Sequence, residues 1–181
     1  YKKLEPSSSG LVYYWGMKKS NPELGVNNIF FSEDYRLDFI DIFEKKRCPA
    51  DPTVYVNITS KHSREDAPGA GENWFILVNA PYDDGQDWTG IEEEFREKVI
   101  GRVSRGLGRD ISGDIACEGR MNPLQIQEKT GYNRGSLYGI ASNSKMAAFL
   151  RHRNRSTRYP GLYFCGGSAH PGGGMRRCRS G

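Results

Sequence analysis

Hydrophobic residues alternate with polar ones, or form short apolar runs, in four stretches of the first eighty residues. Residues 11–15 and 28–31 are rich in aromatic or β-branched side chains, with turn-forming Asn21-Pro22 between them. Residues 53–59 alternate and are β-branched, whereas residues 74–78 are nearly all apolar, as in a strand covered on both faces. We expect four strands here, with the last two paired in one sheet.

Apolar residues at spacings of three and four predict two longer helices. The first starts at residues 32–34 and continues to Lys46, and its apolar side consists of Tyr35, Phe39, Ile42 and Phe43. The second covers residues 91–106, with Thr89 as its cap, glutamates 92–94 in its first turn, and Gly106 and Gly108 at its end. Its apolar side consists of Ile91, Phe95, Val99, Ile100 and Val103.

Strands and helices also interleave in the rest of the chain. We expect a strand near residues 114–118, a short helix after Asn122-Pro123, a helix around residues 143–150, and a last strand at residues 161–165. This order predicts an α+β (mixed α/β) fold in which helices pack on a sheet. A length of 181 residues suits one ordinary domain.

The formal net charge of +4 is concentrated at the carboxyl end. Seven arginines lie there: Arg151, Arg153, Arg155, Arg158, Arg176, Arg177 and Arg179. Such a cluster suits phosphate, anionic lipid or nucleic acid, but it is equally consistent with a solvated face. Nucleic-acid binding is the least favoured of these, and we expect none.

The four cysteines are far apart, without a C-x-x-C pair or a histidine at ligand spacing, so no metal site is expected. No apolar run reaches about 18 residues, the length that predicts a spanning helix. Free thiols in a reducing, cytoplasmic setting are the expectation.

The strongest chemical signal is at residues 161–174, where a predicted strand enters a loop with five glycines, one proline and one histidine. Glycine allows the backbone to approach a flat ligand, and its exposed N–H groups can point at an anionic oxygen. A flexible linker is the alternative, but it would lack the strand that precedes the loop. The residues alone indicate a cofactor loop without naming the cofactor.

The string GLYFCGGSAHPGGGM at residues 161–175 resembles the carboxyl-terminal flavin motif of phytoene and hydroxycarotenoid desaturases. Further blocks resemble this family in the same order, at residues 7–10, 15–16, 28–32, 51–55, 72–74, 135–139, 149–152 and 154. The chain therefore resembles the carboxyl-terminal part of an FAD-dependent carotenoid desaturase of the phytoene dehydrogenase family, which belongs to the amine-oxidase-like flavoproteins.

The resemblance implies that residues 1–160 are part of a polyene-binding substrate domain. Residues 161–181 would then be the returning strand and glycine-rich loop of a split, Rossmann-type FAD domain. It also implies an oxidoreductase that introduces double bonds into a C40 polyene by passing hydride to FAD. The implied cofactor-binding residues are Gly166, Gly167, Ser168, His170, Pro171, Gly172, Gly173 and Gly174. No catalytic residue is implied.

The resemblance leaves two further groups of residues open. Arg151, His152 and Asn154 could line the flavin cavity, meet lipid, or form a solvated surface. Aromatic residues could line a polyene tunnel, although a place in the core is the more common use of such residues in strands. They are Tyr13, Tyr14, Trp15, Phe30, Phe31 and Trp74. A lipophilic carotenoid substrate implies peripheral contact with a membrane; the oligomeric state is left open.

Two departures from the family pattern support an alternative. The family's amino-terminal G-x-G-x-x-G unit is absent from this sequence, and Arg176-Arg177-Cys178-Arg179 stands where the family has proline and a final helix. The alternative is a non-catalytic binding or interaction module that keeps the substrate-domain fold without bound FAD.

Overall fold

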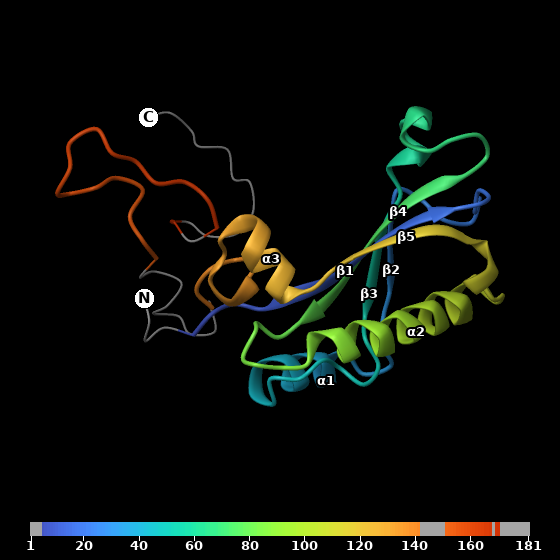
Figure 1. The fold of residues 1–181 in the computed structure, drawn as a ribbon, viewed down its shortest axis with the longest axis horizontal. Coiled ribbons are helices and arrows are strands. Elements are labelled where there is room, and N and C mark those ends of the chain that lie inside the picture. Colours follow the sequence, from blue (N-terminus) through green and yellow to red (C-terminus); the bar gives the residue numbers. More distant parts are fainter. Residues whose placement is uncertain (1–4, 142–150, 168, 171–181) are drawn as a thin grey trace.

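The computed structural model describes residues 5–141, 151–167, 169 and 170. Its body is a five-stranded sheet in the order β2-β3-β4-β1-β5, in which every neighbouring pair is antiparallel (Figure 1). The strands are β1 (Ser9–Met17), β2 (Asn27–Phe30), β3 (Val54–Asn57), β4 (Glu72–Ala80) and β5 (Ile115–Met121). The predicted α+β class is confirmed, and so is the pairing of β3 with β4.

Three α-helices accompany the sheet: α1 (Tyr35–Phe39), α2 (Trp88–Leu107) and α3 (Pro123–Thr130). A π-helical turn, Ile40–Glu44, continues α1. The helix predicted after Asn122-Pro123 is confirmed as α3, whose cap is reciprocal. The side chain of Asn122 accepts from the N–H of Gln125, while the side chain of Gln125 accepts from the N–H of Asn122.

Helix α2 begins earlier than predicted, because Asp87 and not Thr89 caps it. The Asp87 carboxylate accepts the N–H of Gly90, which makes Trp88 the first helical residue. The helix ends as predicted at Gly108, which has a φ of 65°. Glutamates 92–94 consequently lie beyond the first turn, where the helix dipole contributes little.

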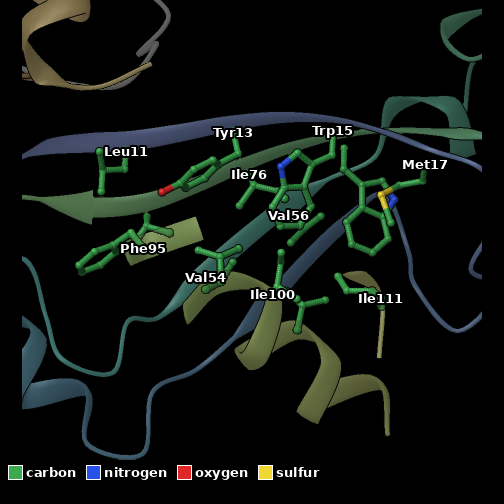
Figure 2. Close-up of a cluster of buried hydrophobic side chains, with 14 of the residues drawn as sticks. Leu11, Tyr13, Trp15, Met17, Val54, Val56, Ile76, Phe95, Ile100 and Ile111 are labelled. Carbon is green, nitrogen blue, oxygen red and sulfur yellow. The ribbon is translucent and has the colours of Figure 1, made fainter. Parts of the chain in front are cut away.

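The hydrophobic core lies between α2 and one face of the sheet (Figure 2). The predicted inner side of α2 is confirmed, since Phe95, Val99, Ile100 and Val103 are buried and Ile91 packs against them partly exposed. Alternate residues of the sheet meet this helix. From β1, β3 and β4 these are Leu11, Tyr13, Trp15, Met17, Val54, Val56, Trp74, Ile76 and Val78. Among the aromatics left open by the sequence, Tyr13, Trp15 and Trp74 are thus core residues, and Phe30 packs against the core.

The last predicted strand is wrong. Residues 161–165 contribute only one isolated bridge, between Arg155 and Tyr163, and Leu162, Tyr163 and Phe164 are exposed. An apolar strand of this kind is stable when neighbouring strands pair with both edges and other elements cover both faces. Among the described residues, Arg155 is the only bridge partner of residues 161–165. The helix predicted at residues 143–150 lies outside the described residues.

Candidate functional site

The described part of the glycine-rich segment, residues 161–167, 169 and 170, belongs to a hairpin-like extension that starts at residue 151 and projects from the body beside α3 (Figure 1). Arg151 connects the extension to the body. Its guanidinium donates to the carbonyls of Tyr138 and Ile140, each at 3.2 Å, and to the carbonyl of Gly167. The body side of this contact is itself fixed to the amino-terminal segment, because the N–H of Ser7 donates to Gly139 O at 2.7 Å.

Within the extension, the backbone is held by His152 and Asn154, which the sequence analysis grouped with Arg151. The N–H of Phe164 donates to Asn154 O at 2.7 Å, and the N–H of His170 donates to His152 O at 2.9 Å. The Asn154 amide donates to the carbonyls of Phe164 and His170, at 3.3 and 2.7 Å. The His152 ring meets the Phe164 ring edge-on, with centroids 4.4 Å apart. Arg151, His152 and Asn154 therefore brace the start of the predicted cofactor loop.

Of the predicted cofactor-binding residues, the structure describes Gly166, Gly167 and His170. Ser168, Pro171, Gly172, Gly173 and Gly174 lie outside the described residues. His170 is exposed, and its recorded hydrogen bonds are made by the backbone. A role for its imidazole stays a prediction.

The two described glycines have different surroundings. Gly166 has a φ of 119°, which other residues rarely adopt, and a Cβ at this position would meet no heavy atom of the described residues within 4 Å. Gly167 faces the body, where a Cβ would lie 3.5 Å from Tyr138 Cα. One side of this backbone is thus packed and the other is open. The geometry fits the close approach of a flat group, such as a flavin ring, to Gly166.

A second candidate surface is the sheet face opposite α2. Side chains on this face line up across all five strands, because Ile29 pairs with Tyr55, Tyr55 with Leu77, Leu77 with Val12, and Val12 with Met121. We call these five residues the sheet-face row. With strands about 4.8 Å apart, the row extends about 19 Å across the sheet. Next to it, Phe75 pairs with Tyr14, and their rings meet edge-on at 5.6 Å.

This surface is only partly covered. Ile29 and Tyr14 are exposed, Tyr55, Leu77 and Met121 are half-buried, and Val12 is buried. Of the six aromatics named from the sequence, Tyr14 and Phe31 are outside the core, so the tunnel interpretation remains open for these two, and Tyr14 lies on this surface. The sequence did not reveal the row as a unit, because its members come from five separate segments. The available signal was the alternation at residues 53–59. The uniformly apolar or aromatic stretches at residues 11–15 and 74–78 do not distinguish the two faces of β1 and β4.

A third surface lies at α1, whose outward side is apolar. Phe31, Tyr35 and Phe39 are 59, 44 and 46% exposed. Their rings form a continuous series with Phe43, since successive centroids are 5.8, 5.0 and 6.0 Å apart. We call these four residues the aromatic row. The predicted apolar side of this helix thus faces outward, except for Ile42, which is buried.

Two acidic residues occupy the inward side of the same segment. Asp38 and Asp41 are each only 5% exposed. Burial raises the pKa of Asp38, although hydrogen bonds from Thr53 and Ser32 oppose this. Burial acts the same way on Asp41, but Lys45 and Arg47, both at 2.9 Å, outweigh it and lower its pKa. Helix α1 is therefore the reverse of an ordinary surface helix, which buries apolar and exposes charged residues.

The predicted absences can be examined only over the described residues. There, no cluster of three or more histidine, cysteine or acidic side chains is arranged to hold a metal ion. In the same part of the chain, no helix combines the length and the apolar character needed to cross a bilayer.

Comparison with known proteins finds relatives whose names describe the modification of carotenoids. It is 47% identical over 176 residues to 1-hydroxycarotenoid 3,4-desaturase from Flavobacterium sp. (strain P99-3), a match that covers 97% of this chain and 36% of that protein. It is 33% identical over 175 residues to 4,4'-diaponeurosporene oxygenase from Staphylococcus aureus (strain USA300), covering 96% of this chain and 35% of that protein. No family model matches the chain. The chain thus spans about a third of the length of these curated relatives.

Proposed function

Because this chain belongs to the carotenoid desaturase family, as a carboxyl-terminal part of such a protein, we propose that it supplies the polyene-binding sheet and part of the flavin contact of a carotenoid desaturase. The observation that carries the proposal is the 47% identity to a hydroxycarotenoid desaturase over nearly the whole chain. The proposed division is a substrate-domain part at residues 1–160 and a part of the FAD domain at residues 161–181.

The reaction would remove a hydride and a proton from adjacent saturated carbons of a C40 polyene, leaving a double bond between them. FAD, when bound, supplies the hydride acceptor, which no amino-acid side chain provides. The role of this chain is positioning. The open side of Gly166 would admit the flavin ring, and Arg151 would hold that backbone in place through Gly167.

The sheet-face row would bind the polyene. It offers apolar and aromatic side chains, without a charged group, across the width of the sheet. Burial of apolar surface is worth about 25 cal/mol per Å², so a long hydrocarbon gains affinity mainly from contact area. We do not propose that any side chain of the row accepts the proton, and the catalytic base stays unassigned.

The same proposal includes contact with a lipid surface through the aromatic row. Carotenoids dissolve in lipid, so an enzyme acting on them must reach a bilayer. Exposed aromatic side chains favour the membrane–water boundary, and the acidic groups of α1 are turned away from it. This association would be peripheral.

A chimera tests the enzymatic proposal. This chain would replace the matching segment of the Flavobacterium desaturase, and the purified protein would be examined for flavin absorbance and for conversion of a hydroxycarotenoid. We expect bound flavin and a product that has lost two hydrogens, seen by mass and by a red-shifted spectrum. A folded chimera that holds flavin but leaves the carotenoid unchanged contradicts the proposal.

Two controls sharpen the result. The unmodified Flavobacterium desaturase gives the reference activity. Gly166→Val in the chimera should reduce flavin content, because valine is strained at a φ of 119° and fills the open side of the loop. A chimera without flavin whose sheet still binds a polyene would instead favour the non-catalytic binding module.

A further inference from the structure

A hollow of about 470 Å³ opens on the same face of the sheet as the sheet-face row. It lies where β1, β4 and β5 run side by side, and the loop at residues 66–68 forms one wall. Its volume is within the range of about 300–1,000 Å³ that is usual for ligand sites.

Two glycines give the hollow its depth. Gly119 pairs with Tyr14 and Gly16 pairs with Cys117, so each pair presents one side chain where a sheet usually presents two. A Cβ at Gly16 would lie 2.6 Å from Cys117 Sγ, and a Cβ at Gly119 would lie 3.7 Å from Tyr14 Cβ. A side chain at Gly119 would extend into the hollow, whereas one at Gly16 would collide with the Cys117 thiol, which occupies the space beside this glycine.

The lining is mainly apolar or already hydrogen-bonded. Tyr14 and Phe75 form an aromatic wall, and the Cys117 thiol is exposed beside them. The Asn73 side chain is engaged, because its oxygen accepts the N–H of Ser60 at 2.9 Å and its nitrogen donates to Thr59 Oγ1 at 2.7 Å. Aromatic rings, a thiol and glycine backbone suit a thin, unsaturated hydrocarbon better than a polar ligand.

The hollow is continuous with the sheet-face row. Tyr14 and Phe75 line the hollow, and two residues further along the same strands stand Val12 and Leu77 of the row. Two residues of a strand span about 6.6 Å, so one extended chain can contact both.

We propose that this hollow binds one end of a linear isoprenoid chain whose remainder lies on the sheet-face row. The inference rests on the proposed function, because it assumes that the row carries a polyene. It adds a site for the end of the substrate, formed by Gly16, Tyr14, Phe75, Cys117 and Gly119.

The Cys117 thiol provides a direct test, because an occupant of the hollow would cover it. In a variant with Cys165→Ser and Cys178→Ser, maleimide would modify Cys117 with and without geranylgeraniol, a linear C20 isoprenoid alcohol. Cys48 should react slowly, since burial raises the pKa of its thiol to about 12. With the probe at about ten times its Kd, mass action leaves about a tenth of the sites free, so modification should slow about tenfold.

Two controls show whether protection is local. Cys165, examined in a Cys117→Ser, Cys178→Ser variant, lies on the extension and should react at an unchanged rate. Gly119→Val fills the hollow and should abolish the protection of Cys117, while Ala116→Val places the same side chain on β5 outside the lining residues and should leave the protection intact. Circular dichroism would establish that both variants keep the sheet.

Modification of Cys117 at the same rate with and without the probe overturns the inference, and so does protection that persists in Gly119→Val. The proposed function fails separately. A chimera that desaturates its substrate while the hollow stays empty refutes only this inference. Protection of Cys117 combined with an inactive, flavin-containing chimera refutes only the enzymatic proposal.

Discussion

Glu72 carries a carboxylate that water does not reach, since its side chain is fully buried. It accepts hydrogen bonds from the Trp74 indole at 2.9 Å and from the N–H of Asn21 at 3.1 Å, and it pairs with Lys61 at 2.7 Å. Burial would raise the pKa of Glu72, but these partners outweigh it and lower the pKa to about 2. The residue joins the start of β4 to the loop that follows β1.

We expect Glu72→Gln to destabilise the fold by about 3 kcal/mol at pH 7, because it leaves Lys61 without its buried partner. The free energy of unfolding of the parent protein should contain an acid-sensitive contribution that the variant lacks. A depressed carboxylate pKa stabilises the folded state above the ordinary value of 4.5, and this stability is lost as pH falls from 4.5 towards about 2. Urea unfolding at pH 7, 4.5 and 3 measures both effects. Parallel pH curves for parent and variant would contradict this assignment.

No pattern in the sequence indicates this cluster. Glu72 is followed by Asn73-Trp74 in a block that resembles the desaturase family, but its partner Asn21 is 51 residues away. Residue pairs brought together by tertiary pairing leave no local pattern. The same reason explains why the sheet-face row was missed, whereas the grouping of Arg151, His152 and Asn154 with the loop came from family resemblance.

At the scale of the element, replacing either of two glycines of α2 by alanine is expected to change the stability of the protein, in opposite directions. A Cβ at Gly106 would overlap the ring of Phe30, whereas a Cβ at Gly101 would meet only Arg105 Nη1 at 3.6 Å. We expect Gly101→Ala to stabilise the protein by about 1 kcal/mol, through helix propensity alone. We expect Gly106→Ala to destabilise it by about 1–2 kcal/mol, because the ring must move out of a packed position. Thermal unfolding of both variants gives the comparison, and equal shifts of the same sign would show that Phe30 does not constrain Gly106.

The elements that the sequence predicted well are those whose signals are local. The inner side of α2 follows from its period, the start of α3 from Asn122-Pro123, and the end of α2 from Gly108. The start of α2 was misplaced because Asp87 and Thr89 are both good caps, and only the geometry distinguishes them. Residues 161–165 have the composition of a buried strand, but composition does not supply the neighbouring strands that such an element needs.

The aromatic row on α1 predicts a specific loss of lipid binding. A double variant, Phe31→Gln with Phe39→Gln, should bind phosphatidylcholine vesicles about thirtyfold more weakly, since each exposed ring contributes about 1 kcal/mol on entering lipid. Both side chains are exposed, so the melting temperature should change little. Cosedimentation with vesicles measures the binding, and Leu124→Gln on α3 is a matched control of similar exposure. If the double variant and the control sediment alike, the lipid surface lies elsewhere.

At the scale of the whole molecule, the Arg151 side chain hydrogen-bonds to both the body and the extension within the described residues. Arg151 donates to carbonyls on both sides of the joint, two on the body and one at Gly167. A guanidinium is planar and has five N–H donors, which lets it satisfy several carbonyls at once. Lysine keeps the charge but concentrates its donors on one nitrogen, so it cannot reproduce this arrangement.

We therefore expect Arg151→Lys to loosen the extension without affecting the sheet. The amides of Phe164 and His170 are hydrogen-bonded within the extension and should exchange with solvent faster in the variant. The amides of Ile76 and Val78 lie in the central strand and should be unchanged. Hydrogen exchange resolved by mass spectrometry or NMR measures the two groups in one sample. In the chimera, the same substitution should lower flavin content while the sheet keeps its affinity for a polyene, because the loop at Gly166 would lose hydrogen bonds that attach it to the body at Tyr138 and Ile140. An unchanged exchange rate at the His170 amide would mean that contacts other than those of Arg151 hold the extension on the body.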